Sequence, residues 1–201
     1  MKVLITFPRF GSTWIQKYIN KENTLNYGSK DLYDYFGKKH VGTTLDKIAF
    51  LENERINGQE YSVKYFTYHE PVLMGWTKDF YKNSTIIKLK RRDLYRAFLS
   101  YVAQYETKWK YHNAKTSHDL TIYNQQCNNL TVSADSIKEW FNRYSTFINF
   151  KDYDEELIYE DFIPNNPKVK STIKYDIDYE TRIVNIEYVQ KEYTRCMKLL
   201  N

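Results

Sequence analysis

This chain of 201 residues lacks long apolar runs, internal repeats and any pair of cysteines with a functional spacing. Its two cysteines, Cys127 and Cys196, match neither a metal site nor a redox motif, so we expect two reduced thiols. No segment approaches the roughly 18 apolar residues of a membrane span, so we predict no transmembrane helix and no membrane partner. Without repeats, low-complexity tracts or a clear linker, residues 1–201 are expected to form one domain.

Glycine and proline are also scarce, with six and four residues against 20 tyrosines. This bias carries little functional information, but a hydrophobic content of 42% predicts a folded chain rather than a disordered one. The formal net charge is +5, from 30 basic and 25 acidic side chains. Such a mild excess suits a nucleotide, an acidic glycan or a nucleic acid equally. Because no basic leader and cleavage site precede the first apolar segment, we expect a cytoplasmic protein.

Hydrophobic periodicity alternates between short apolar strands and amphipathic helices. The strand patterns cover residues 2–7, 61–68, 85–91 and 157–159, with a further period-two pattern over residues 168–179. The helix patterns cover residues 13–19, 44–55, 94–105, 134–148 and about the last twenty. Asp93 and Ser133 are expected to cap two of these helices.

This alternation predicts an α/β fold, a three-layer sandwich with a mainly parallel central sheet covered on both faces. Ligands of such sheets bind in the crevice at the carboxyl ends of the strands. The strand patterns end at distinctive polar or aromatic residues, so we expect the functional site there.

Residues 8–14 (Pro-Arg-Phe-Gly-Ser-Thr-Trp) follow the first strand pattern and open a helix. A helix N-terminus offers unbonded backbone N–H groups and a positive dipole end, which together suit a phosphate. Gly11 allows close approach of the backbone, while Ser12 and Thr13 add hydroxyl groups and Arg9 adds a positive charge. The alternative is a capped strand-to-helix turn with its tryptophan in the core. The Walker pattern, Gly-x-x-x-x-Gly-Lys-Ser/Thr, occurs nowhere in the chain.

This stretch closely resembles the 5′-phosphosulfate loop of sulfotransferases that use 3′-phosphoadenosine-5′-phosphosulfate (PAPS). That loop reads Pro-Lys-Ser-Gly-Thr-Thr-Trp or Pro-Arg-Ser-Gly-Ser-Thr in members of the family. The resemblance puts Arg9 at the basic position and Trp14 beside the adenine, and implies that the backbone amides of residues 10–14 hold the phosphosulfate. Phe10 departs from the pattern, because the family usually has a small polar residue there, and the change removes a hydrogen bond.

Arg92 and Ser100 provide a second match, at the end of a strand pattern and on the helix that follows. A guanidinium can bind a phosphate through two hydrogen bonds, and a hydroxyl on the next helix can complete the site. The sulfotransferase family carries an Arg and a Ser at this spacing, usually as Arg-Asn/Asp-Pro followed by a Ser-Tyr pair. The resemblance implies that Arg92 and Ser100 bind the 3′-phosphate, with Leu94 in place of the proline. For Lys90, Arg91 and Arg96 the alternative is an ordinary solvated basic cluster, and this alternative is favoured for Arg96.

His69 follows the second strand pattern, and sulfuryl transfer needs a base that takes the proton of the acceptor. A histidine titrates near neutral pH, which suits that role. Many cytosolic sulfotransferases have Lys-Thr-His-Leu-Pro here, so His69 resembles their catalytic base, although Thr67 occupies their lysine position. Several carbohydrate sulfotransferases use a glutamate, which makes the adjacent Glu70 an alternative base. Lys64 lies on the other face of the strand and is a weaker substitute for the lysine.

Tyr159 begins a Tyr-Glu-Asp segment that resembles the family segment whose tyrosine borders the adenine. The resemblance spans about residues 3–163 and implies a nucleotide-kinase-like, P-loop-type fold. The chain lacks the C-terminal Arg-Lys-Gly-x-x-Gly-x-Trp-Lys loop with which many cytosolic members close over the 3′-phosphate.

Together these matches predict an enzyme that transfers a sulfuryl group from PAPS to a hydroxyl or amine of a small molecule, glycan or peptide, releasing adenosine 3′,5′-bisphosphate. Arg9 would also stabilise charge on the leaving group, and the family chemistry needs no metal. One alternative is a metal-dependent nucleotide or small-molecule kinase on a related fold, which predicts a loop lysine that the chain lacks. Another is a non-catalytic anion- or nucleic-acid-binding module, against which the spread of the charge argues, so we expect no nucleic-acid partner.

Overall fold

The computed structural model describes residues 2–12, 15, 19, 25–26, 61–67, 84–108, 122, 125–162 and 177–200. The chain divides into two compact units. The first contains Met1–Arg92 and Thr146–Asp161, and the second contains Asp93–Ser145 and Phe162–Asn201. The expectation of one domain over the whole chain stays a prediction.

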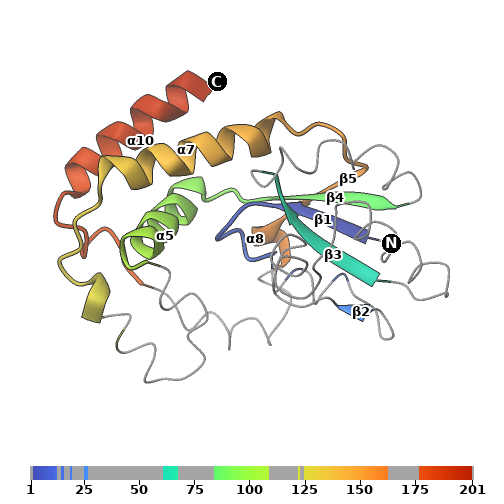
Figure 1. Ribbon diagram of the computed structural model, residues 1–201, viewed down its shortest axis with the longest axis horizontal. Helices are drawn as coiled ribbons and strands as arrows, with labels where there is room; N and C mark the ends of the chain where they lie inside the picture. Colours follow the sequence, from blue (N-terminus) through green and yellow to red (C-terminus); the bar gives the residue numbers. More distant parts are fainter. Residues whose placement is uncertain are drawn as a thin grey trace, which may run out of the picture. The chain divides into compact units, whose positions relative to one another are not determined.

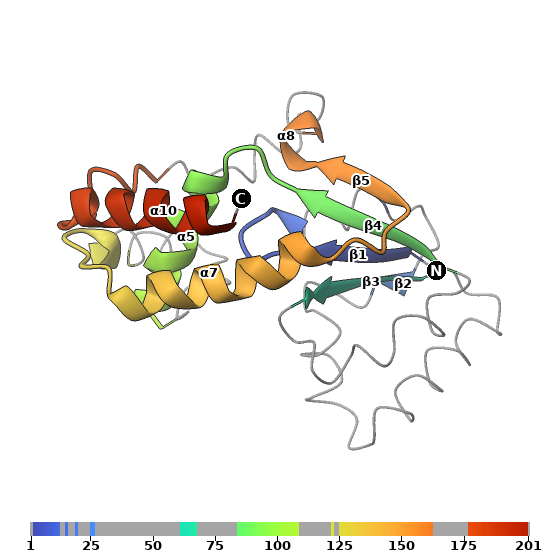
Figure 2. The same ribbon diagram turned by 90° about the horizontal axis from the view of Figure 1, so that it is seen from above.

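The first unit is built on a five-stranded sheet in which every strand pairing is parallel. Its strands are β1 (Lys2–Thr6), β2 (Leu25–Asn26), β3 (Tyr61–Phe66), β4 (Thr85–Lys90) and β5 (Glu155–Ile158). Their order is β2-β3-β1-β4-β5, which puts β1 in the centre (Figures 1 and 2). The predicted α/β class with a parallel sheet is therefore confirmed.

Burial explains why β1 is the central strand. Val3, Leu4 and Ile5 are consecutive and all fully buried, so both faces of β1 are covered. An uninterrupted apolar run of this kind is typical of the inner strands of parallel sheets. The strands predicted over residues 2–7 and 85–91 are confirmed as β1 and β4, although each ends one residue earlier than the sequence pattern.

Lys88 is a buried cation in the middle of β4, with only 2% of its surface exposed. Its ammonium group donates to the carbonyl oxygen of Phe150 at 2.5 Å and to that of Ile148 at 3.5 Å, at the end of helix α7 (Ala134–Asn149). Burial, reinforced by repulsion from two neighbouring lysines, lowers the pKa of Lys88 from 10.5 to about 8. Lys88 therefore donates hydrogen bonds to carbonyl groups at the C-terminal end of a helix, where the last carbonyl groups have no partner within the helix.

The second unit contains α5 (Leu94–Glu106), α7 up to Ser145, and α10 (Ile186–Leu200). Asp93 caps α5, because its carboxylate accepts a hydrogen bond from the N–H of Arg96 at 2.9 Å. The predicted cap at Asp93 is confirmed, and the last helix is confirmed from Ile186 onward.

Ser133 caps α7 through two partners. Its hydroxyl oxygen accepts from the N–H of Ser136 at 3.2 Å and donates to a carboxylate oxygen of Glu106 at 2.6 Å. The same carboxylate oxygen accepts from the N–H of Ser133 at 2.8 Å. The end of α5 is thereby bonded to the start of α7.

An aromatic cluster joins α5, α7 and α10 in the second unit. Phe98 of α5 lies 5.2 Å from Trp140 of α7 and 4.9 Å from Tyr193 of α10, measured between ring centres. Phe141 of α7 lies 5.9 Å from Tyr193. Each such pair contributes roughly 0.5–1.5 kcal/mol beyond the area that it buries. The helical periodicity of α5, α7 and α10 thus serves one shared core.

Two segments differ from their predicted structure. Tyr159 begins helix α8 (Tyr159–Phe162) instead of ending a strand, because the acidic Glu160 and Asp161 after it suit the first turn of a helix. Ile177 and Tyr179, expected in a strand, are buried in an irregular segment. Alternating burial in such a segment gives the same sequence pattern as a strand. The predicted helix over residues 44–55 lies outside the described residues.

Candidate functional site

The chain leaves β1 through a tight turn. The N–H of Phe10 donates to the carbonyl oxygen of Phe7 at 3.2 Å. Pro8 stands at the second position and Arg9 at the third, where Arg9 has a φ of 69°. This arrangement fits a type II turn, whose third position requires a positive φ and usually carries glycine. Arg9 therefore holds a backbone conformation that costs a non-glycine residue about 1–2 kcal/mol.

Gly11 connects this turn to a helix. It has a φ of 74°, and its carbonyl oxygen accepts from the N–H of Ile15 at 3.1 Å. Ser12 is the first helical residue. Because the first N–H groups of a helix have no partner within it, the backbone after Gly11 offers donors to an anion. The predicted strand–loop–helix structure is confirmed, while Thr13 and Trp14 lie outside the described residues.

Phe10 anchors the loop instead of facing a ligand with its side chain. The side chain is fully buried, and its ring centre lies 5.5 Å from that of Phe7 and 5.4 Å from that of Phe147. The departure from a small polar residue thus exchanges a polar loop side chain for an aromatic core contact. Since the Phe10 N–H is bonded within the turn, the donors for an anion start at Gly11.

Arg91, for which the sequence left a solvated position open, connects three parts of the site. Only 16% of its side chain is exposed. It donates to the carbonyl oxygen of Arg9 at 2.5 Å, and its guanidinium carbon lies 5.2 Å from the ring centre of Tyr159. Its Nε lies 3.5 Å from a carboxylate oxygen of Glu160. Nothing in the sequence distinguishes Arg91 from the arginine after it; burial does.

The Tyr159 ring lies directly against Gly11. A β-carbon built on Gly11 would be only 2.1 Å from the Cε2 atom of that ring, well inside any normal contact. The sequence expectation that the tyrosine belongs to the same site as the loop is therefore supported by contact. Its proposed contact with adenine stays a prediction.

Arg92 and Ser100 differ in surroundings. Arg92 is 58% exposed, forms a 2.6 Å ion pair with Asp161, and its backbone N–H donates to Glu160 at 2.9 Å. Ser100 is buried on α5, with its hydroxyl 3.4 Å from that of Tyr179. The two predicted phosphate ligands belong to different units, and their joint role stays a prediction.

The loops after β1 and β4 lie at a position where parallel sheets bind ligands. From β1 the chain continues to β2 at one edge of the sheet, and from β4 it continues to β5 at the other. Neighbouring strands whose connections leave in opposite directions form a crevice at their carboxyl ends. Arg9 and Gly11 stand at the end of β1, and Arg91 and Arg92 stand at the end of β4.

Both candidate bases, His69 and Glu70, lie outside the described residues. Just before them, the buried Thr67 has its hydroxyl 3.3 Å from that of Thr146. Lys64, the weaker lysine candidate, is 5% exposed on β3. In the described parts of the chain, no group of three or more His, Cys, Asp or Glu side chains could hold a metal ion.

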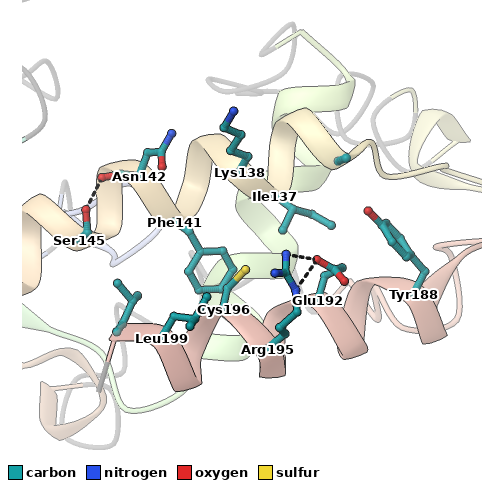
Figure 3. A pocket seen from close by; sticks show the side chains of 12 residues that line it. Ile137, Lys138, Phe141, Asn142, Ser145, Tyr188, Glu192, Arg195, Cys196 and Leu199 are labelled. Atoms are coloured by element: carbon teal, nitrogen blue, oxygen red, sulfur yellow. Dashed lines mark hydrogen bonds and ion pairs between the residues drawn. The ribbon is translucent and has the colours of Figure 1, made fainter.

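A groove of about 480 Å³ runs between α7 and α10 in the second unit (Figure 3). Ile137, Phe141, Tyr188 and Leu199 give it an apolar lining, and its rim carries an ion pair between Arg195 and Glu192 at 2.7 Å. None of the described residues that the sequence predicts for the site is among those that line it.

No protein-family model, curated protein or solved structure matches the chain. The resemblance to sulfotransferases therefore stays a prediction from the sequence. In the segments that the structure describes, no helix is long and apolar enough to cross a membrane.

Proposed function

We propose that this chain binds PAPS at the carboxyl ends of β1, β4 and β5 and transfers its sulfuryl group to an acceptor. One observation carries the proposal. Three segments far apart in the sequence, residues 8–12, 91–92 and 159–161, contact one another within one unit. The sequence resemblance connects each of them to the same nucleotide. This closeness supports the proposal because segments that bind one nucleotide must lie together.

The 5′-phosphosulfate would lie at the start of the helix after β1. Arg9 supplies a positive charge, the backbone N–H groups from Gly11 onward supply donors, and the Ser12 hydroxyl adds another. At the 3′-phosphate, the proposed ligands are Arg92 and Ser100. The remaining proposed nucleotide contacts are Thr13, Trp14 and Tyr159.

The proposed fold is a three-layer, nucleotide-kinase-like sandwich. The strand order supports it, because the chain leaves β1 and β4 toward opposite edges of the sheet, the arrangement at which sheets of this class bind ligands. The positive φ at both Arg9 and Gly11 supports it further, since such conformations concentrate where backbone groups approach a ligand.

In the proposed reaction His69, or alternatively Glu70, takes the proton of the acceptor hydroxyl or amine. The acceptor atom forms a bond to sulfur as the bond from sulfur to the phosphate oxygen breaks, and adenosine 3′,5′-bisphosphate leaves. By analogy with phosphoryl transfer, positioning and charge stabilisation supply most of the rate enhancement. Arg9 is the described residue best placed in the sequence to stabilise the leaving oxygen.

The transfer is tested by incubating the protein with PAPS and a panel of phenol, amine, glycan and peptide acceptors, and by using chromatography to measure the adenosine 3′,5′-bisphosphate that is released. Acceptor-dependent release is expected. His69→Ala and Glu70→Gln form a matched pair for the base, and we expect the histidine variant to be inactive and the glutamine variant active. The reverse result would assign the base to Glu70. Phosphate transfer from ATP without turnover of PAPS would contradict the sulfotransferase proposal and favour the kinase alternative.

A further inference from the structure

The turn after β1 contains a strained residue whose backbone must be held in place. Arg9 has a φ of 69°, in the left-handed region that glycine adopts freely and arginine does not. Such a conformation persists only where the surroundings fix it. Pro8 before it and the buried Phe10 after it fix the ends of the turn, but neither bonds the carbonyl group of Arg9 itself.

Arg91 is the side chain that does so. Its guanidinium donates to the Arg9 carbonyl oxygen at 2.5 Å while it lies over the Tyr159 ring and beside Glu160. One planar group thus ties the loop after β1 to the segment after β5. An ammonium group has neither the planar shape nor the fork of donors needed to make these contacts together.

We propose that Arg91 is a positioning residue that fixes the anion-binding conformation of the loop after β1. By holding the peptide between Arg9 and Phe10, Arg91 keeps the Phe10 N–H bonded to the carbonyl oxygen of Phe7, so the donors proposed for the anion begin at Gly11. The identity of the anion, the 5′-phosphosulfate of PAPS, rests on the proposed function. Arg91 acts here through the backbone of Arg9, whereas Arg92 is proposed to bind phosphate directly.

Calorimetric titration of wild type and of the Arg91→Met variant with adenosine 3′,5′-bisphosphate measures how much Arg91 contributes to the affinity for the nucleotide. We expect affinity to fall roughly tenfold to a hundredfold, the range for one hydrogen bond to a charged group. Arg91→Lys keeps the charge and should not restore affinity. Full rescue by lysine would show that charge alone matters and would overturn the proposal. Should the Arg91→Met variant fail to fold, the affinity of the Arg91→Lys variant is compared directly with that of wild type.

A double-mutant cycle separates positioning from direct binding. In an Arg9→Gly background the backbone no longer needs to be held, so Arg91→Met should weaken binding by no more than about threefold further. Arg92→Met, the matched control, should weaken binding by the same factor in both backgrounds, within about twofold. An equal effect of Arg91→Met in both backgrounds would overturn the positioning role.

Hydrogen exchange of the Phe10 amide, in protein without ligand, tests the loop independently of any nucleotide. We expect Arg91→Met to speed that exchange by about tenfold or more, since the turn loses its restraint. If wild-type protein binds no adenosine 3′,5′-bisphosphate but exchange still accelerates, the proposed function fails and the role of Arg91 stands. Unchanged exchange would contradict the role of Arg91 whatever the ligand.

Discussion

Replacing Gly11 by alanine places a methyl group where the Tyr159 ring lies. The added carbon would be 2.1 Å from Cε2, 2.5 Å from Cδ2 and 2.7 Å from Cζ of that ring. Normal carbon contacts are about 3.5–4.0 Å, so the ring or the loop must move by more than about 1 Å. Overpacking of this kind costs roughly 1–3 kcal/mol, and the φ of 74° adds about 1–2 kcal/mol for a non-glycine residue. We expect Gly11→Ala to lower the free energy of unfolding by about 2–5 kcal/mol.

Urea unfolding of wild type, Gly11→Ala, Tyr159→Ala and the double variant separates the cost of the steric overlap from the cost of the positive φ. Removing the ring should relieve the steric part, so that Gly11→Ala costs only about 1–2 kcal/mol in the Tyr159→Ala background. A coupling free energy of about 1–3 kcal/mol between the two sites is the expected outcome. A Gly11→Ala variant as stable as wild type, or equal effects in the two backgrounds, would refute the contact between the loop and Tyr159.

Three further predictions concern charges and caps. Because burial lowers the pKa of Lys88 from 10.5 to about 8, the folded state binds fewer protons than the unfolded state between these two values. Between pH 7 and 9.5, the free energy of unfolding of wild type should therefore rise by about 1–3 kcal/mol relative to that of Lys88→Met, measured by chemical unfolding. A difference that does not change with pH would contradict this. Asp161→Asn should strengthen binding of adenosine 3′,5′-bisphosphate by up to about fivefold in calorimetry, because it frees Arg92 from an exposed ion pair; weaker binding would count against Arg92 as ligand. Ser133→Ala should lower the free energy of unfolding by about 1–2 kcal/mol through loss of the α7 cap and of a bond to Glu106, and an unchanged thermal midpoint would rule out that cap.

Local chemistry made much of the fold predictable. Val3, Leu4 and Ile5 form an apolar run that is typical of an inner parallel strand, and this run is the central strand of the sheet. Asp93 and Ser133 cap their helices because their side chains accept backbone hydrogen bonds at sequence-defined positions. Signals of this kind depend on neighbours in the sequence, so they can be read without the fold.

The parts that were missed depend on distant neighbours. Arg91 and Arg92 are chemically identical and adjacent, yet the side chain of one is 16% exposed and that of the other 58%. Only the position of Tyr159 and of the Arg9 carbonyl, both far away in sequence, decides which arginine holds the loop. Phe10 carried a usable signal, since an aromatic residue in a polar loop indicates an anchor in the core.

The central claim is that the carboxyl ends of β1, β4 and β5 bind the nucleotide half of PAPS. Calorimetric titration of the wild-type chain with adenosine 3′,5′-bisphosphate tests this most directly, with adenosine 5′-monophosphate as the matched ligand that lacks the 3′-phosphate. We predict a dissociation constant well below about 1 mM for the bisphosphate and weaker binding of the monophosphate. Absence of binding at near-millimolar bisphosphate, or equal affinity for both nucleotides, would contradict the account.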